Sequence, residues 1–346
     1  MKTIFLSLFN NYPFILILFM GLSTPALADF EGSTHAEYPE WFVDAPFLDL
    51  AEVNQEATAN GKKGLMVLFT TRGCSYCEQF IRRSLGDDKI AALVQKDFAS
   101  VGLEIFDDAE MVSPTEETIA VKHFAKKEGV GFAPTLLFYD KNGKMVLRQV
   151  GYQAPKRFIQ LMDYVANEKY LEKSLRDFLA TKPENSSDDK SYVSLKADTL
   201  FENAPYILDR SKFAASEPLM VIFEKPGCAE CKNFHEDVLT LKDVRNTLQK
   251  FQVVRLDPTD DKTPVLLPDG IKTTPFQWYE KTTFSRLPAL LFYDEGGNQV
   301  LQTDALVLHE RMMNSLNYVL EEAYKKDWTY QQFARSKAIE ASQKNN

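Results

Sequence analysis

The sequence predicts an α/β protein made of two tandem copies of one domain, each with a mixed β-sheet flanked by helices. The first observation behind this prediction is a repeated cysteine motif, "CSYC" from Cys74 and "CAEC" from Cys228, which uses all four cysteines of the chain. The second is that the offset between the motifs, 228 − 74 = 154 residues, recurs along both copies. The third is the order of elements within a copy, β-α-β followed by β-β-α, which is typical of a compact domain with a mixed sheet.

The offset of 154 residues aligns long segments of the two copies. "LLFYDKNGK" at 136–144 matches "LLFYDEGGN" at 290–298, and "YVANEKY" at 164–170 matches "YVLEEAY" at 318–324. The units of a solenoid are much shorter than this period. The constant offset therefore indicates duplicated globular domains with almost no net insertion.

Each copy begins with a short apolar run that predicts a buried strand, at 64–69 and at 219–223. Apolar residues then follow each cysteine motif at helical spacing, so each motif lies where a strand passes into a helix. These residues are Cys77, Phe80, Ile81 and Leu85 in the first copy and Cys231, Phe234, Val238 and Leu241 in the second.

The later elements of each copy are a strand, a hairpin and a closing helix. The segments 97–106 and 250–257 each predict one further strand. Each hairpin opens at a proline and turns at "DKNG" or "DEGG" into its second strand. The closing helix starts at Pro155 in the first copy and spans 308–324 in the second.

The N-terminus has the layout of a secretory signal peptide. One cation, Lys2, precedes an apolar stretch at 12–22, and an Ala-Leu-Ala sequence ends at Ala28. We expect cleavage after Ala28, giving a signal peptide at 1–28. The alternative is an uncleaved membrane anchor, although the apolar stretch is shorter than the about 20 residues that span a bilayer.

Removal of the signal peptide leaves 318 residues (346 − 28), which fit two domains of ordinary size. We expect these domains at 29–180 and 192–346, joined by a polar linker at 181–191 that contains a proline. The formal net charge of −9 argues against a nucleic-acid partner. Paired cysteines persist as disulfides in an exported, oxidising compartment, which is where we expect the protein to act.

A cysteine at the start of a helix faces free backbone N–H groups and the positive end of the helix dipole. Both stabilise the thiolate, the attacking species in disulfide exchange, so Cys74 and Cys228 are the candidate nucleophiles. The helix brings Cys77 and Cys231 back within bonding distance. We expect these second cysteines to be more buried and to resolve the mixed disulfide.

The strand, the CxxC motif at a helix start and the proline before the hairpin together resemble the thioredoxin superfamily. More narrowly, the "GCxxC" stretches, the "PTLLFYDKNGK…GYQAP" block and "YVANEKY" resemble the SoxW-type thioredoxin-related proteins of bacterial envelopes. The resemblance implies a periplasmic location and a cis proline beside each active site. There, the residue before the proline pairs with an extended substrate segment, which implies substrate-binding roles for Ala133, Pro134, Leu287 and Pro288.

Two features depart from thioredoxin itself. Glycine stands before each first cysteine, where thioredoxin has tryptophan, and the buried acid of thioredoxin is replaced by Leu68 and Ile222. Proton removal from the second cysteine must then use water or another group. Glu224 is a candidate in the second copy, whereas its counterpart Thr70 cannot accept a proton in this way.

The two motifs also differ in nearby charge. Arg72 lies two residues before Cys74 and should favour its thiolate, whereas Glu230 lies inside the second motif and should disfavour negative charge. Lys225 acts in the opposite direction to Glu230. Our hypothesis is that the second site has the higher thiolate pKa and the more reducing disulfide.

The resemblance implies a thiol-disulfide oxidoreductase that reduces protein or peptide disulfides. It also implies that electrons come through a membrane thiol carrier of the DsbD or CcdA kind. No flavin, nicotinamide or metal cofactor is expected, since the cysteines themselves hold the electrons. The alternatives are a disulfide isomerase and a redox-inert peptide-binding or chaperone-like module.

Other interpretations of the motifs remain open. Either disulfide could be structural, and one copy could serve only for docking or as a spacer. The alternative of a zinc site is weakened by spacing, since the CxxC pairs of such a site usually lie about 15–20 residues apart, much closer than the pairs here. His235 extends the second motif to CxxCxxxH, but its counterpart is Ile81, so the two copies share no metal site.

Overall fold

The structure is a computed structural model that describes residues 37–182 and 198–344. The predicted signal peptide and most of the predicted linker lie outside the described residues. The first domain below means the described residues up to 182, and the second domain means those from 198 onward. No helix in these two ranges is long and apolar enough to cross a membrane.

The first domain is built on a four-stranded mixed sheet in the order β2-β1-β5-β6. β1 is parallel to β2 and antiparallel to β5, and β5 forms an antiparallel hairpin with β6. The strands are β1 (Gly64–Thr70), β2 (Phe98–Glu104), β5 (Thr135–Asp140) and β6 (Met145–Val150), with a separate small hairpin of β3 (Glu110–Val112) and β4 (Thr118–Ala120).

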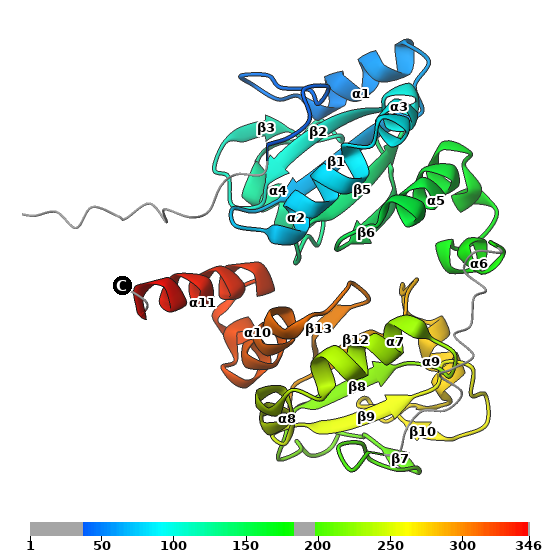
Figure 1. Ribbon diagram of the computed structural model, residues 1–346, viewed down its shortest axis with the longest axis vertical. Coiled ribbons are helices and arrows are strands. Elements are labelled where there is room, and N and C mark those ends of the chain that lie inside the picture. Colours follow the sequence, from blue (N-terminus) through cyan, green and yellow to red (C-terminus); the bar gives the residue numbers. More distant parts are fainter. Residues whose placement is uncertain (1–36, 183–197, 345–346) are drawn as a thin grey trace, which may run out of the picture. The chain divides into compact units, whose positions relative to one another are not determined.

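Helices cover both faces of this sheet (Figure 1). Alternate strand residues point to opposite faces. Leu65, Val67 and Phe69 therefore pack against α1 (Leu50–Ala59) and α4 (Val121–Lys127) on one face. Met66 and Leu68 pack on the other face against α2 (Ser75–Phe80), α3 (Asp88–Asp97) and α5 (Pro155–Ala166). A further helix, α6 (Leu175–Ala180), follows α5 and packs in this second layer.

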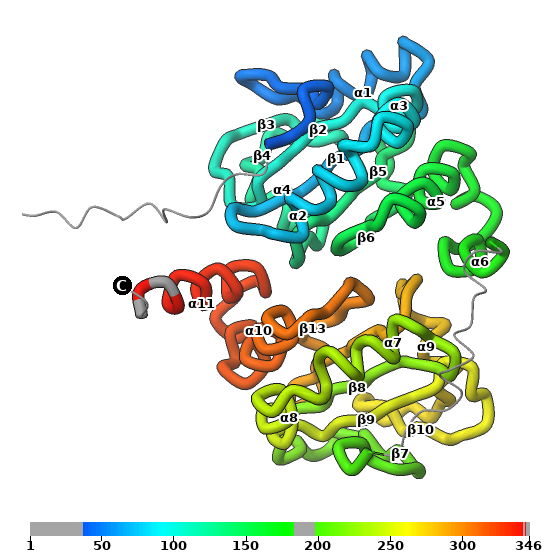
Figure 2. The backbone as a smooth tube through the Cα atoms, in the orientation of Figure 1, coloured from blue at the N-terminus to red at the C-terminus, as the bar shows by residue number. Residues whose placement is uncertain are grey.

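The second domain repeats this plan with a sheet in the order β13-β12-β8-β9. Its strands are β8 (Leu219–Phe223), β9 (Gln252–Leu256), β12 (Ala289–Tyr293) and β13 (Gln299–Thr303), and a small sheet joins β7 (Tyr206–Ile207), β10 (Val265–Leu266) and β11 (Lys272–Thr273). Its helices are α7 (Ala229–Phe234), α8 (Lys242–Leu248), α9 (Pro275–Glu280), α10 (His309–Leu320) and α11 (Tyr330–Lys344). The chain path through these elements can be followed in Figure 2.

The predicted α/β fold with mixed sheets and flanking helices is therefore confirmed in both domains. Both predicted first strands lie in the sheets, and β8 spans the predicted residues 219–223. β2 and β9 fall inside the predicted segments and are shorter at each end. The predicted closing helix of the second domain ends early, at Leu320, and the chain continues into a 3₁₀ turn at Ala323–Lys326.

The helix after each motif differs from a regular α-helix. α2 continues into a π-helical turn at Ile81–Leu85, and α7 continues into one at His235–Leu239. The assignment of Leu241 to the helix after the second motif was wrong, because this residue lies beyond the π-helical turn and caps α8. A π turn holds one extra residue, which explains why strict helical spacing failed there.

Candidate functional site

A glycine in the left-handed region precedes the first cysteine of each motif. The backbone φ angle is 70° at Gly73 and 76° at Gly227. Residues with a Cβ rarely adopt this conformation, so glycine lets the chain turn sharply from the strand into the helix. This backbone requirement accounts for the glycine that replaces the tryptophan of thioredoxin in both motifs.

The first cysteine of each motif caps the following helix. Cys74 is the N-cap residue of α2, and its Sγ accepts a hydrogen bond from the backbone N–H of Cys77 at 3.2 Å. Cys228 caps α7 in the same way, accepting from the N–H of Cys231 at 3.1 Å. N–H groups at a helix start stabilise negative charge, so this contact favours the thiolate form of both first cysteines once the disulfides are reduced.

Each motif forms a disulfide, Cys74–Cys77 and Cys228–Cys231, with a Cα–Cα distance of 5.2 Å in both. Cys77 and Cys231 are fully buried, whereas the first cysteines are partly exposed. The predicted difference in burial is confirmed. The sulfur that solvent and a substrate can reach in each pair is therefore the first one.

The two predicted active-site prolines lie at the same sheet edge as the motifs. Both follow cis peptide bonds, Ala133–Pro134 and Leu287–Pro288, as the resemblance implies. The antiparallel register pairs Phe69 at the end of β1 with Thr135, and Phe223 at the end of β8 with Ala289. Because each proline immediately precedes a strand that starts opposite the end of β1 or β8, the fold brings it to the turn that carries the cysteines.

A cavity of about 130 Å³ lies beside the second motif. It is lined by Glu230 of the motif, by Leu287 and Pro288, and by Phe234 and Val238 of the following helix. The predicted substrate-binding residues of the second domain and Glu230 of its motif therefore border one concave surface. Its apolar side chains suit the side chain of an extended peptide.

Comparison with protein families identifies the fold directly. The thioredoxin-like domain family matches residues 50–166 and again residues 213–320, which together make up more than half of the chain. The chain belongs to the thioredoxin-like domain family. It therefore consists of two thioredoxin-like domains in tandem.

Solved structures similar to this thioredoxin-like protein include a thioredoxin-fold protein from Helicobacter pylori. The alignment has 22% identity and a TM-score of 0.34, and it covers 40% of this chain and 86% of that one. A thioredoxin from Thermus thermophilus is 22% identical over 36% of this chain and 88% of its own, with a TM-score of 0.28. A disulphide isomerase from Xylella fastidiosa Temecula1 is 16% identical over 37% of this chain and 97% of its own, with a TM-score of 0.26. A search of curated proteins finds no significant match.

In the first thioredoxin-like domain, two uncharged hydroxyl groups, those of Thr70 and Tyr38, lie behind the motif at the end of β1. Thr70 is fully buried, and its Oγ1 lies 2.5 Å from the hydroxyl oxygen of Tyr38. The ring of Tyr38 lies over Gly102 of β2, where any side chain would collide with it. Burial raises the pKa of Tyr38 far above its ordinary value, so this group stays neutral.

In the second domain, charged residues occupy the corresponding positions. Glu224 follows β8 and is fully buried, and its carboxylate oxygens lie 2.7 and 2.9 Å from Nε2 of His235. Nε of Arg255 lies 3.6 Å from the same carboxylate. The guanidinium of Arg255 also lies over the ring of Phe201, 4.6 Å from its centre. The second motif therefore has a buried network of three ionisable groups behind it.

Part of this network has a signal in the sequence. Glu224 is the candidate proton acceptor predicted for the second copy, whereas the sequence pattern indicates His235 only as a possible metal ligand. Its spacing of four residues from Cys231 is the signal that places it on the same helix face. Arg255 was missed, although a charged residue in an otherwise apolar strand indicates that it needs a buried partner.

The acidic residue inside the second motif has a cationic partner. Oε1 of Glu230 lies 3.4 Å from a guanidinium nitrogen of Arg286, which precedes Leu287. The side chain of Glu230 is 57% exposed, so water screens this ion pair. The negative charge that the sequence places near Cys228 is therefore partly balanced by Arg286.

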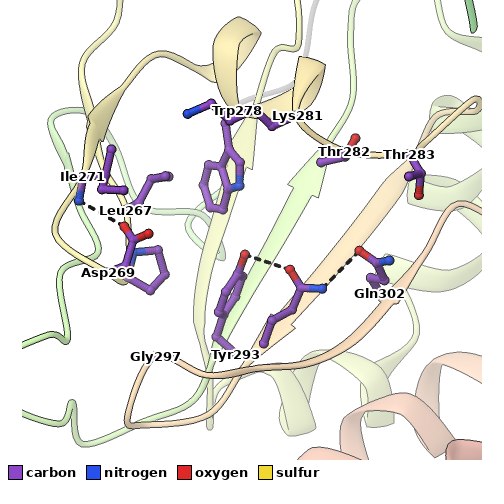
Figure 3. A pocket seen from close by; sticks show the side chains of 12 residues that line it. Leu267, Asp269, Ile271, Trp278, Lys281, Thr282, Thr283, Tyr293, Gly297 and Gln302 are labelled. Carbon is purple, nitrogen blue, oxygen red and sulfur yellow. Dashed lines mark hydrogen bonds between the residues drawn. The ribbon is translucent and has the colours of Figure 1, made fainter. Parts of the chain in front are cut away.

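A larger cavity of about 570 Å³ lies elsewhere in the second domain, and no cysteine lines it. Figure 3 shows Trp278 and Tyr293 in its wall, with Tyr293 hydrogen-bonded to Gln299. At the position of Gln302, the first domain has Arg148, which donates a hydrogen bond to the carbonyl of Glu128. The shorter glutamine leaves space that the arginine would occupy. This cavity is not part of the disulfide chemistry.

No group of three or more histidine, cysteine, aspartate or glutamate side chains in residues 37–182 and 198–344 is arranged to hold a metal ion. His235 contacts the carboxylate of Glu224, and the sulfur of Cys231 is bonded to that of Cys228. The two CxxC disulfides support exchange between thiols and disulfides.

Proposed function

We propose that this protein is an exported thiol-disulfide oxidoreductase that reduces protein or peptide disulfides at its two CxxC sites. The observation that carries the proposal is the shared geometry of the sites. In each, a partly exposed first sulfur caps a helix, a buried second sulfur is bonded to it, and a cis proline lies at the same sheet edge. A structural disulfide does not require this combination.

The proposed reaction begins with the reduced motif. The thiolate of Cys74 attacks one sulfur of a substrate disulfide, the substrate S–S bond breaks, and one substrate cysteine leaves as a thiolate. Cys77 then loses its proton and attacks the sulfur of Cys74. This releases the second substrate thiolate and forms the Cys74–Cys77 disulfide, so two electrons have passed to the substrate. Cys228 and Cys231 act in the same order.

Substrate recognition is proposed to involve the residues at the cis prolines. Leu287 and Pro288 border the cavity beside the second motif, where an extended segment can lie against the exposed sulfur. Ala133 and Pro134 have the equivalent positions in the first domain. A substrate segment bound there aligns its disulfide with the attacking cysteine. Correct orientation of a bound substrate accelerates the reaction.

The last parts of the proposal are the export of the protein and the re-reduction of its CxxC disulfides. The N-terminal layout supports a signal peptide cleaved after Ala28 and a periplasmic location, and the SoxW-type resemblance supports a membrane thiol carrier as electron donor. N-terminal sequencing of the mature protein should begin at Asp29. Retention of residues 1–28 would replace this part of the proposal with a membrane anchor.

The deciding experiment compares reduction with reshuffling. The full mature chain, a Cys74→Ser/Cys77→Ser variant and a Cys228→Ser/Cys231→Ser variant are each given insulin and a dithiol reductant. We expect reduction by the native chain, partial activity in each variant and none when all four cysteines are replaced. Full activity of the four-serine chain in the cell would instead support the redox-inert binding module.

A second assay separates the reductase from the isomerase. The protein is mixed with a scrambled multi-disulfide protein in the absence of external reductant. A reductase breaks one bond for each reduced motif and then stops, whereas an isomerase restores the native pairing catalytically. Recovery of native activity over many turnovers would overturn the reductase assignment and leave thiol-disulfide exchange intact.

A further inference from the structure

The network behind the second motif connects a buried cysteine to solvent. His235 lies four residues after Cys231, and its backbone N–H donates to the carbonyl of Cys231. Side chains four residues apart on a helix are neighbours, with Cβ atoms about 5–6 Å apart. Cys231 is fully buried, whereas the side chain of His235 is 17% exposed. His235 is therefore a partly exposed neighbour of the buried Cys231 on the same helix.

Glu224 fixes which nitrogen of His235 can act as a base. Both carboxylate oxygens of Glu224 lie within hydrogen-bond distance of Nε2. An ionised carboxylate only accepts hydrogen bonds, so Nε2 carries the hydrogen and the lone pair of neutral His235 is on Nδ1. A carboxylate that orients an imidazole in this way also stabilises the imidazolium formed when it takes up a proton.

The charged groups around His235 come from several elements. Glu224 comes from the end of β8 and Arg255 from β9. Asp198, at the start of the second domain, is close enough for the two charges to interact, and Arg245 of α8 is paired with it. The charges of the two carboxylates and of their two guanidinium partners sum to zero. When His235 takes the proton of Cys231, its positive charge is balanced by the thiolate that forms.

The first domain has no ionisable group at the matching positions. Thr70 replaces Glu224 and Ile81 replaces His235, both by the offset of 154. The sheet register pairs Leu68 with Gly102 and Ile222 with Arg255, so Gly102 takes the position of Arg255. The contrast provides an internal control, because the two motifs share their backbone geometry and differ in this network.

We propose that His235, positioned by Glu224, accepts the proton of Cys231 when the second site resolves its mixed disulfide, and that the first site resolves without such a group. The inference rests on the proposed function. The S–H bond of Cys231 breaks and its proton moves to Nδ1 of His235. The thiolate attacks the sulfur of Cys228, the mixed disulfide breaks, and the substrate leaves as a thiolate. His235 then returns the proton to solvent.

The test uses the full mature chain with Cys74→Ser and Cys77→Ser, so that only the second site reacts. The reduced protein is mixed with an aromatic disulfide, 5,5′-dithiobis(2-nitrobenzoate), in a stopped-flow instrument. Attack by Cys228 releases the first coloured thiolate, and resolution by Cys231 releases the second. The two steps are therefore measured in one trace.

The expected result separates the steps. His235→Gln should slow the second release on the order of 100-fold at pH 7, at the low end of the range of general-base effects. The first release should change little. In the native site the second release should rise with pH well below the range in which a free thiol ionises, because the base removes the proton. In the variant it should rise only near the ordinary thiol pKa of about 8.5, where the thiolate forms without a base.

Controls keep the outcomes distinct. Glu224→Gln should give a smaller loss in the second step, and Ile81→Ala, tested with the second site silenced, should leave the first site's pH profile unchanged. If His235→Gln fails to fold, the pH profile of the native second site decides, since a rise only near pH 8.5 would overturn the proposal. Equal second-step rates in native and variant sites would also overturn it. Absence of any thiolate release would instead contradict the proposed function as a thiol-disulfide oxidoreductase.

Discussion

The two domains share the parts that present the cysteines and differ in the parts behind them. Gly73 and Gly227 adopt the same left-handed turn, and each first cysteine caps its helix in the same way. Behind the motif, the first domain has a neutral tyrosine–threonine pair. At the corresponding position, the second domain has a buried glutamate–histidine–arginine network. Duplication has kept the geometry needed for disulfide exchange and has changed the supply of protons and charge.

This comparison predicts its largest effect at Arg255. Arg255→Met should destabilise the second domain by about 3–5 kcal/mol at pH 8, because it removes a cation from a buried carboxylate. Urea unfolding followed by circular dichroism measures the difference between the variant and the native chain.

A double variant tests the reason for that loss. Glu224→Gln combined with Arg255→Met removes both charges, so it should recover part of the stability lost in the single variant. If the double variant is as unstable as the sum of the two single variants, the guanidinium contributes by packing on Phe201 and its charge is not the cause.

The neutral pair of the first domain should matter less. Thr70→Val leaves the buried hydroxyl of Tyr38 without its partner, which costs about 1–3 kcal/mol. Adding Tyr38→Phe should recover most of that loss, since both polar groups are then absent. Unfolding of the three variants gives the coupling energy, and a double variant whose loss equals the sum of the two single losses would show that the hydrogen bond contributes nothing. The pH profile of the first site should be the same in all of them.

The sequence was sufficient for the fold and for placing the two CxxC motifs and the two cis prolines within it. Buried strands, helix starts and the two prolines have strong local signals, because alternation, Gly and Pro restrict the backbone directly. The helices α1 and α11 were not predicted, since their helical periodicity is weak beside that of the core helices. The π-helical turns were not predicted either, because one extra residue changes the spacing without changing the residue types.

The buried network behind the second motif shows why contacts between distant residues could not be predicted from the sequence. The offset of 154 pairs Arg255 with Val101, but the sheet register places it opposite Gly102. A one-residue shift between β2 and β9 leaves no trace in the motif spacing. Glu224 and His235 are eleven residues apart in sequence, and only the turn from β8 into α7 brings them together. Pairings of this kind depend on the three-dimensional register.

A smaller difference concerns acid stability. Arg245 holds the pKa of Asp198 at about 2 through a hydrogen-bonded ion pair, below the ordinary 3.8, whereas the first domain has Ala91 at the position of Arg245. A lowered carboxyl pKa adds stability that is complete above the ordinary value and is lost as pH falls towards 2. We expect about 1 kcal/mol from this partly exposed pair at pH 7.

Asp198→Asn measures that contribution. The variant should unfold more readily than the native protein at pH 7, and the two should converge as pH falls from about 4 to 2. Arg245→Met should give the same loss, and the double variant should add little to it. A constant difference across the whole pH range would show that the asparagine disturbs packing and that the charge is not responsible.

The smallest expected effect concerns the redox potentials of the two sites. Glu230 disfavours a thiolate at Cys228, so the second disulfide should be the more reducing of the two, but its pairing with Arg286 and its exposure weaken this influence. Glu230→Gln should therefore raise the potential of the second site by less than about 30 mV, equivalent to about 1.4 kcal/mol. Arg286→Gln, which exposes the full charge of Glu230, should lower it by a similar amount. Equilibration of each single-site chain with glutathione gives the potentials. If the first site proves the more reducing, charge inside the motif does not order the two domains, and the difference must come from the buried network behind Cys231.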